Sequence, residues 1–286
     1  MIAVSNMIQP ETFEEALRAL AGEKVMACAG GTNLYVDRKH GKYLDWDYVS
    51  LDRLEGLRDI WEDTEGWNIG AMANFAALEG LEIPYARALS AAASQVGGPQ
   101  IRNRGTIGGN ILSASPAADS VPVLMALDAQ VRLVRYGGEE RQVPICEFMV
   151  GPGRTNLRPG ELLTRVVLPP KQGRSVFYKA GKRSAMAISV CSAAVYMDCL
   201  DGRIREIGVA LGSVAPTAVR ARRAEAVLLG SAREDLNETS FKERLKEALM
   251  EDIAPIDDIR ATAEYRRRIA NRMVLHNLTE LWRCFK

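Results

Sequence analysis

Two short segments with paired glycines constrain the fold of this chain more than any other feature. The first, 29–34, reads Ala-Gly-Gly-Thr-Asn-Leu and follows the apolar run 25–28; the second, 106–110, reads Thr-Ile-Gly-Gly-Asn. Glycine adopts backbone conformations closed to other residues and lets main-chain N–H groups approach an anion closely. Either segment alone could be a tight turn that needs glycine. Together, with hydroxyl and amide side chains alongside, they favour a cradle for a phosphate-containing ligand.

The most familiar nucleotide-binding signatures are missing. No Gly-x-x-x-x-Gly-Lys-Ser/Thr run occurs, which excludes a P-loop, and neither glycine segment has the Gly-x-Gly-x-x-Gly spacing of a Rossmann fold. A nucleotide bound here would need another fold. Asp119 follows the second segment at the start of an apolar helical pattern. There its carboxylate either accepts hydrogen bonds from sugar hydroxyls or only complements the helix dipole.

The composition argues against several classes of function. The chain has 286 residues, 47% of them hydrophobic and 26% charged, with a net charge of +1. These values are ordinary for a globular protein, and the chain lacks the excess of positive charge that is typical of nucleic-acid-binding proteins. No run approaches the roughly 18 apolar residues of a membrane span, and the N-terminus lacks the features of a signal peptide. We therefore expect no membrane span and, by default, a cytoplasmic location.

The five cysteines and two histidines offer little chemistry. No Cys-x-x-Cys pair occurs, so we expect no zinc site or iron–sulfur cluster held by this chain. His40 lies in a polar stretch and His276 in a helical pattern, and neither has an obvious nucleophile as partner. We therefore expect no metal ligands and no catalytic residues of the hydrolytic kind.

The hydrophobic pattern predicts an α+β protein in two parts. The polar segment 171–174 separates them, which gives domains 1–172 and 173–286. Beyond the break, two strands joined at Asp201-Gly202 come first and helices follow. The predicted strands are 25–28, 47–51, 67–71, 129–136, 161–168, 187–198 and 204–214. The predicted helices are 10–21, 75–79, 85–96, 116–127, with Ser115 as its N-cap, and about 217–229, 240–250 and 262–283.

The glycine segments, taken with others in order, resemble the FAD-binding medium subunit of molybdenum hydroxylases, the family of xanthine, nicotinate and carbon monoxide dehydrogenases. The resemblance implies an FAD-binding domain of the vanillyl-alcohol-oxidase (PCMH) type over 1–172. A domain like the C-terminal part of the CO dehydrogenase flavoprotein, a three-stranded sheet plus helices, would cover 173–286. The other matching segments are 94–103, 115–119, 157–163, 177–179 and 210–217.

The resemblance also implies roles for individual residues. The glycine segments would hold the pyrophosphate and ribityl chain, and Asp119 would bind sugar or ribityl hydroxyls. Leu162 or Leu163 would lie beside the isoalloxazine ring. Lys179 would stabilise negative charge at the polar edge of the reduced flavin; without the resemblance it would be taken for a solvated strand lysine. The expected FAD-binding residues are Ala29, Gly30, Gly31, Thr32, Asn33, Leu34, Thr106, Ile107, Gly108, Gly109, Asn110, Asp119, Leu162, Leu163 and Lys179.

The sequence departs from the family pattern in two places, and each changes what we expect of cofactor binding. Asn33 stands where many relatives carry aspartate, so a contact to FAD or to the backbone would differ there. No cysteine lies between Cys28 and Cys146, so the [4Fe–4S]-binding insertion of aryl-CoA reductases is not expected. The run 95–103 is most similar to the xanthine- and nicotinate-type subunits.

The function implied by the resemblance is electron transfer within a complex. A large partner subunit would carry molybdopterin and a small one [2Fe–2S] clusters, in a dimer of heterotrimers. Electrons would pass from the clusters via FAD to NAD or another acceptor. Two alternatives remain open: a self-contained FAD-dependent oxidoreductase of the same fold, which would turn over a small substrate alone, and a non-catalytic assembly protein that has lost the flavin.

Overall fold

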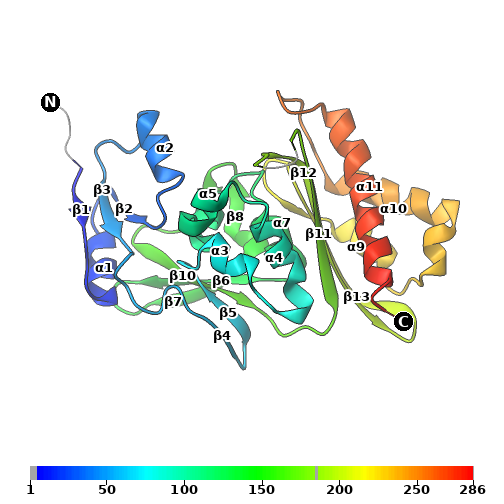
Figure 1. Cartoon of the computed structure of the whole chain (residues 1–286), viewed down its shortest axis with the longest axis horizontal. Coiled ribbons are helices and arrows are strands. Elements are labelled where there is room, and N and C mark those ends of the chain that lie inside the picture. The colour runs from blue at the N-terminus through cyan, green and yellow to red at the C-terminus, as the bar shows by residue number, and fades with distance from the viewer. Residues whose placement is uncertain (1–4, 184–185, 286) are drawn as a thin grey trace.

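The first region of the fold is a small parallel sheet near the N-terminus (Figure 1). The computed structural model describes residues 5–183 and 186–285. Strands β1 (Met7–Ile8), β2 (Val25–Cys28) and β3 (Asp47–Ser50) pair in the order β1-β3-β2. α1 (Phe13–Leu20) packs its buried face on this sheet and begins with the predicted capping box between Thr12 and Glu15. α2 (Leu34–Lys39) follows the first glycine segment.

The central region is a five-stranded antiparallel sheet covered by short helices. The strand order is β4-β5-β10-β6-β7, from β4 (Ile60–Asp63), β5 (Gly66–Gly70), β6 (Gln130–Arg135), β7 (Glu140–Pro144) and β10 (Glu161–Leu168). The helices are α3 (Phe75–Glu79), η1 (Pro84–Ala86), α4 (Arg87–Ala93), α5 (Pro99–Arg104), α6 (Ile107–Leu112), α7 (Ser120–Ala126) and α8 (Ile145–Phe148); β8 (Met149–Gly151) and β9 (Arg154–Thr155) form a small hairpin.

The C-terminal region is a second antiparallel sheet with helices on both faces (Figure 1). Three long strands, β11 (Arg174–Gly181), β12 (Ser189–Leu200) and β13 (Arg203–Gly212), match the expected three-stranded sheet, and the two-residue β14 (Val219–Arg220) extends it. Along β12, Ala194 and Tyr196 face the central core with α7, whereas Ala193 and Val195 face the outer helices. Those helices are α9 (Arg222–Leu228), η2 (Glu234–Asn237), α10 (Thr239–Asp252) and α11 (Ala263–Trp282).

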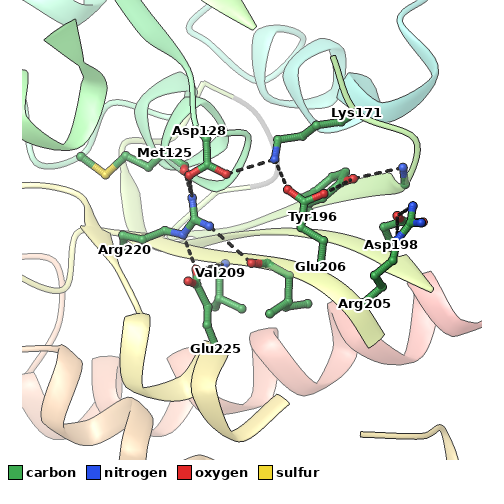
Figure 2. Close-up of polar contacts among 12 residues, drawn as sticks. Met125, Asp128, Lys171, Tyr196, Asp198, Arg205, Glu206, Val209, Arg220 and Glu225 are labelled. Atoms are coloured by element: carbon green, nitrogen blue, oxygen red, sulfur yellow. Dashed lines mark hydrogen bonds and ion pairs between the residues drawn. The ribbon is translucent and has the colours of Figure 1, made fainter. Parts of the chain in front are cut away.

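A polar network joins the central and C-terminal regions (Figure 2). Arg220 on β14 donates to Asp128, which follows α7, at 2.9 Å, and to Glu225 on α9. Lys171, between β10 and β11, donates to Asp128 at 3.0 Å and to Glu206 on β13. The side chains of Lys171 and Arg220 are each only 6% exposed. We call this the hinge network, because its members come from both sides of the connection between the two regions.

Three expectations from the pattern need correction. The helix predicted over 116–127 begins only at Ser120, because Ser115 accepts from the main-chain N–H of Ala118 in a turn. Most of the second glycine segment is the helix α6, with Thr106 as N-cap, rather than a loop. The pattern misses β4 and β7, which are the edge strands of the central sheet, and β11, which carries Lys179.

Candidate functional site

The first glycine segment touches residues 104 and 105, which immediately precede the second segment, where the first sheet meets the central helices. A Cβ atom on Gly30 would lie 1.7 Å from the carbonyl oxygen of Arg104, so only glycine allows this approach. Gly31 has a φ of +74°, in the left-handed region that favours glycine. A Cβ atom on Gly105 would lie 3.6 Å from the Thr32 hydroxyl. The first segment and the residues that lead into the second therefore lie in direct contact.

The first glycine segment offers unused main-chain donors. Among residues 5–183 and 186–285, no protein acceptor lies within hydrogen-bonding reach of the N–H groups of Gly30, Gly31 and Thr32. All three residues are half-buried. Half-buried donors without a protein partner need water or a ligand, and a pyrophosphate oxygen bound by amides is one such ligand. The segment therefore fits the phosphate end of a dinucleotide.

The second glycine segment uses most of its donors inside the protein. The N–H groups of Ile107 and Gly108 bond to the carbonyls of Ala73 and Ala71, and that of Gly109 bonds to the Thr106 hydroxyl. A Cβ atom on Gly108 would lie 2.8 Å from Ala71. Gly108 is therefore needed first for packing α6 against the end of β5. The two segments look alike in sequence but differ in what they leave free for a ligand.

Asp119 and Lys179 form a buried ion pair across the two regions. The Nζ atom of Lys179 on β11 lies 2.5 Å from Oδ2 of Asp119, and both side chains are less than 10% exposed. The Ser189 hydroxyl on β12 donates to Oδ1 of Asp119 at 2.7 Å. Burial raises the pKa of the Asp119 carboxyl above its ordinary value, while Lys179 and Ser189 oppose that rise. Lys179 is therefore not a solvated strand lysine, and Asp119 is held by two groups from the C-terminal sheet.

Asp119 also sits next to the second glycine segment. The hydroxyl of Ser120, its neighbour, donates to the side-chain oxygen of Asn110 at 2.6 Å. Asp119 occupies the N-cap position of α7, yet its side chain makes no capping hydrogen bond. Its carboxylate is turned to Lys179 and Ser189 instead, so capping does not explain its place. The structure thus brings Asn110, Asp119 and Lys179 together, and their contact with FAD stays a prediction.

A cleft of about 360 Å³ lies beside this ion pair. One wall is the segment 94–102, in which the carbonyl of Gln95 accepts from Lys179 at 3.0 Å. Gly97 in this wall has a φ of +52°. The opposite wall is the end of β11 with residues 181, 183, 186 and 187. The cleft therefore lies between the central and C-terminal regions, with Lys179 in its lining.

The remaining predicted residues surround the glycine segments in different ways. Leu162 and Ala29 belong to the apolar core of the first region, whereas Leu163 packs into the central core, and both leucines are 2% exposed. Asn33 donates from its side chain to Asp37 at 2.9 Å, at the start of α2 with Leu34. A contact of Leu162 or Leu163 with the isoalloxazine ring stays a prediction.

Sequence reasoning misses Ser189 and Gln95. Ser189 is one of two serines in the apolar strand β12, and nothing in its spacing marks it. Gln95 contributes a main-chain carbonyl, which any residue could supply, but it lies in the quoted run 94–103. That run is the available signal, since its double glycine, Gly97 and Gly98, lines the cleft.

Two absences hold within the described ranges. No helix there is both long enough and apolar enough to cross a membrane. No group of three or more His, Cys, Asp or Glu side chains in residues 5–183 and 186–285 is arranged to hold a metal ion.

Comparison with known proteins agrees with this geometry. Residues 3–171 match the family model described as the FAD binding domain in molybdopterin dehydrogenase, and residues 176–281 match the CO dehydrogenase flavoprotein C-terminal domain. The xanthine dehydrogenase FAD-binding subunit of Escherichia coli O157:H7 is 31% identical over 94% of this chain and 93% of its own length. The nicotinate dehydrogenase FAD-subunit of Eubacterium barkeri is 40% identical over 63% of this chain and 64% of its own.

The fold also matches a solved structure over nearly its whole length. A chain of the carbon monoxide dehydrogenase from Hydrogenophaga pseudoflava superposes with a TM-score of 0.90 and 30% identity, covering 99% of this chain and 98% of that one. The two-region architecture described above is therefore shared with that chain.

Proposed function

The chain belongs to the family of FAD-binding medium subunits of molybdenum hydroxylases, and on this premise we propose that it is the electron-transfer subunit of such a complex. Electrons would arrive from [2Fe–2S] clusters on a small partner subunit and leave to NAD or another acceptor. A large partner subunit would carry molybdopterin, in a dimer of heterotrimers in the cytoplasm. The division at 172/173 would separate the FAD-binding domain from the C-terminal domain.

One observation carries this proposal: unused main-chain donors at the first glycine segment accompany a buried ion pair beside an inter-region cleft. Gly30, Gly31 and Thr32 would bind the pyrophosphate through their N–H groups. Asn110 and Asp119 would accept hydrogen bonds from hydroxyls of the FAD sugar or ribityl chain. FAD, when bound, supplies the redox chemistry by taking up and releasing electrons.

The protein's own contribution is to orient that group and to set the charge around it. Lys179 places a positive charge in the lining of the cleft, where it would stabilise negative charge on the flavin. Burial of Asp119 and Lys179 excludes water from the pair, which strengthens the interaction between their charges. Nothing in this set acts as an acid or base on an organic substrate, which is consistent with substrate chemistry on another subunit.

FAD binding by the purified chain tests the proposal, with Gly31→Ala as the informative variant. The new methyl group would meet only the ring of Tyr35, which is 60% exposed and free to move. It would, however, strain the left-handed backbone and crowd the cradle. We expect the FAD dissociation constant, from titration of the visible flavin absorption, to rise about tenfold or more, the cost of weakening a charge-assisted hydrogen bond.

Gly41→Ala is the matched control. Gly41 has a φ of +85° and no atom within 4 Å of an added Cβ, so this variant carries similar strain outside the site. We expect it to bind FAD like the unmodified chain. An unmodified chain that takes up no flavin on reconstitution would overturn the proposal. If Gly31→Ala and Gly41→Ala bind FAD with equal affinity, the first glycine segment is not part of the FAD site.

A further inference from the structure

A second cleft lies away from the glycine segments, on the outer side of the C-terminal sheet. It has a volume of about 530 Å³ and lies between η2 and α10 on one side and α11 on the other. Figure 1 shows these helices on the face of the sheet turned away from the central region. The cleft is therefore separate from the site proposed for FAD, and its volume suits a small molecule.

The charged residues that line this cleft all carry the same sign. Arg272 lies on α11, and Arg233 and Lys242 face it from η2 and α10; among the described residues no carboxylate lines the cleft. The ion pairs formed nearby join other residues, Arg223 with Glu251, Lys246 with Glu243 and Arg283 with Glu280. Because the chain as a whole is almost neutral, this gathering of unpaired cations is local. The three side chains are exposed, and together their positive charges favour an anion in the cleft.

The rest of the lining combines hydrogen-bond donors with an apolar surface. His276 and Thr279 share one face of α11 with Arg272, because they are spaced four and three residues apart. Trp282 continues this face and is 4% exposed, so its ring adds buried apolar surface to the lining of the cleft. Leu236 and Leu275 complete the apolar lining.

From this geometry we propose that the cleft between α10 and α11 binds a small organic phosphate with at least two negative charges. A ligand with two or more negative charges would balance most of the positive charge of Arg233, Lys242 and Arg272. Its phosphate oxygens would accept hydrogen bonds from the guanidinium and ammonium groups. The apolar lining suits the uncharged body of such a molecule. The His276 ring also packs edge-on against Tyr178 on the outer face of β11, with ring centroids 5.1 Å apart.

Calorimetric titration of the full chain tests the proposal, with inorganic triphosphate and ATP as probes. Saturating FAD is present throughout, so that neither probe occupies a dinucleotide site. We expect saturable binding of one triphosphate per chain, tighter binding of ATP, and no binding of adenosine alone. Arg272→Gln and Lys242→Gln should each weaken binding about tenfold, because each removes a charge-assisted contact. Raising the salt concentration should also weaken binding.

Arg267→Gln provides the matched control. Arg267 is an exposed residue of the same helix that does not line the cleft, so its loss should leave binding unchanged. Absence of saturable binding, or equal weakening by Arg267→Gln and Arg272→Gln, would overturn the proposal. It would also be overturned if the assembled complex fails to bind the probes while Arg272→Gln impairs assembly, because the cleft would then be a contact for an acidic partner surface.

Discussion

Two ion-pair clusters connect the central and C-terminal regions, and they are built differently. The hinge network saturates its main cation: Arg220 donates to Asp128, to Glu225 and to the carbonyls of Met125 and Ile207. Figure 2 shows Asp128, Met125 and Glu225 around the Arg220 side chain. Burial would lower the pKa of Arg220, but Glu225 and Asp128 outweigh it and the pKa is raised. This cluster has the character of a scaffold, in which each buried charge is compensated.

The cluster around Asp119 is smaller and less fully compensated. Asp119 has one cation, Lys179, and one hydroxyl, Ser189, and its pKa is raised rather than lowered, mainly by burial. Lys179 lines a cleft, whereas Lys171 and Arg220 of the hinge network are buried among their acceptors. A carboxylate that is buried and incompletely paired stays available to further hydrogen-bond donors, such as the hydroxyls of a ligand. The comparison suggests that the hinge network fixes the two regions and the Asp119 cluster uses the resulting geometry.

Among the substitutions considered for the two clusters, we expect Arg220→Met to have the largest effect on stability. The variant leaves two carboxylates and two carbonyls without their common donor, and removal of one partner from a buried ion pair costs about 3–5 kcal/mol. We expect a loss near the upper end of that range in urea unfolding. Arg222→Gln is the control: Arg222 contacts the same Glu225 at 3.2 Å but is 64% exposed, so the loss should stay below about 1 kcal/mol. Similar losses for both variants would contradict a scaffold role.

Lys179→Met probes the second cluster and should have a smaller, pH-dependent effect. We expect the FAD-free chain to lose about 3 kcal/mol at neutral pH, because Asp119 then lacks its counter-charge. The folded-state pKa of Asp119, already above its unfolded value, rises further. Both variant and unmodified chain therefore lose stability as the pH rises through that pKa, the variant more. The difference between them should shrink toward pH 5.

The double variant Asp119→Asn with Lys179→Met completes this measurement. Without the carboxylate there is no unpaired charge, so most of the lost stability should return at neutral pH. A difference between Lys179→Met and the unmodified chain that does not change with pH would show that the lost packing of the lysine, rather than the charge of Asp119, governs the effect.

The sequence reveals this site wherever the backbone itself imposes a residue type. Gly30 and Gly31 are visible because close approach and a positive φ exclude side chains there. Asp119 and Lys179 could be assigned only through the family resemblance, since they lie 60 residues apart and neither is unusual in its local pattern. Their direct pairing follows from how α7 packs on the C-terminal sheet, which no local signal encodes.

The hinge network shows the same limit more strongly. Arg220 and Asp128 are separated by 92 residues, and Lys171 lies in the polar segment that the sequence presents only as a flexible break. Its burial depends on Tyr196, whose ring lies 4.6 Å from the Lys171 ammonium. The second glycine segment shows the converse case: its sequence looks like a ligand loop, yet its main-chain N–H groups bond to Ala71, Ala73 and Thr106.

Ser189→Ala is the smallest change to the Asp119 cluster, and we expect it to have the smallest effect on stability. It removes one hydrogen bond to a buried carboxylate, and we expect a loss of about 1.5 kcal/mol in unfolding at neutral pH, again larger at pH 8 than at pH 5. Ser192→Ala is the matched control on the same strand: its hydroxyl is equally buried but has no hydrogen-bond partner among the described residues. Its removal should be neutral or slightly stabilising, because an unsatisfied buried hydroxyl is lost. Equal effects of the two substitutions would mean that Ser189 only fills space and that Lys179 alone holds Asp119.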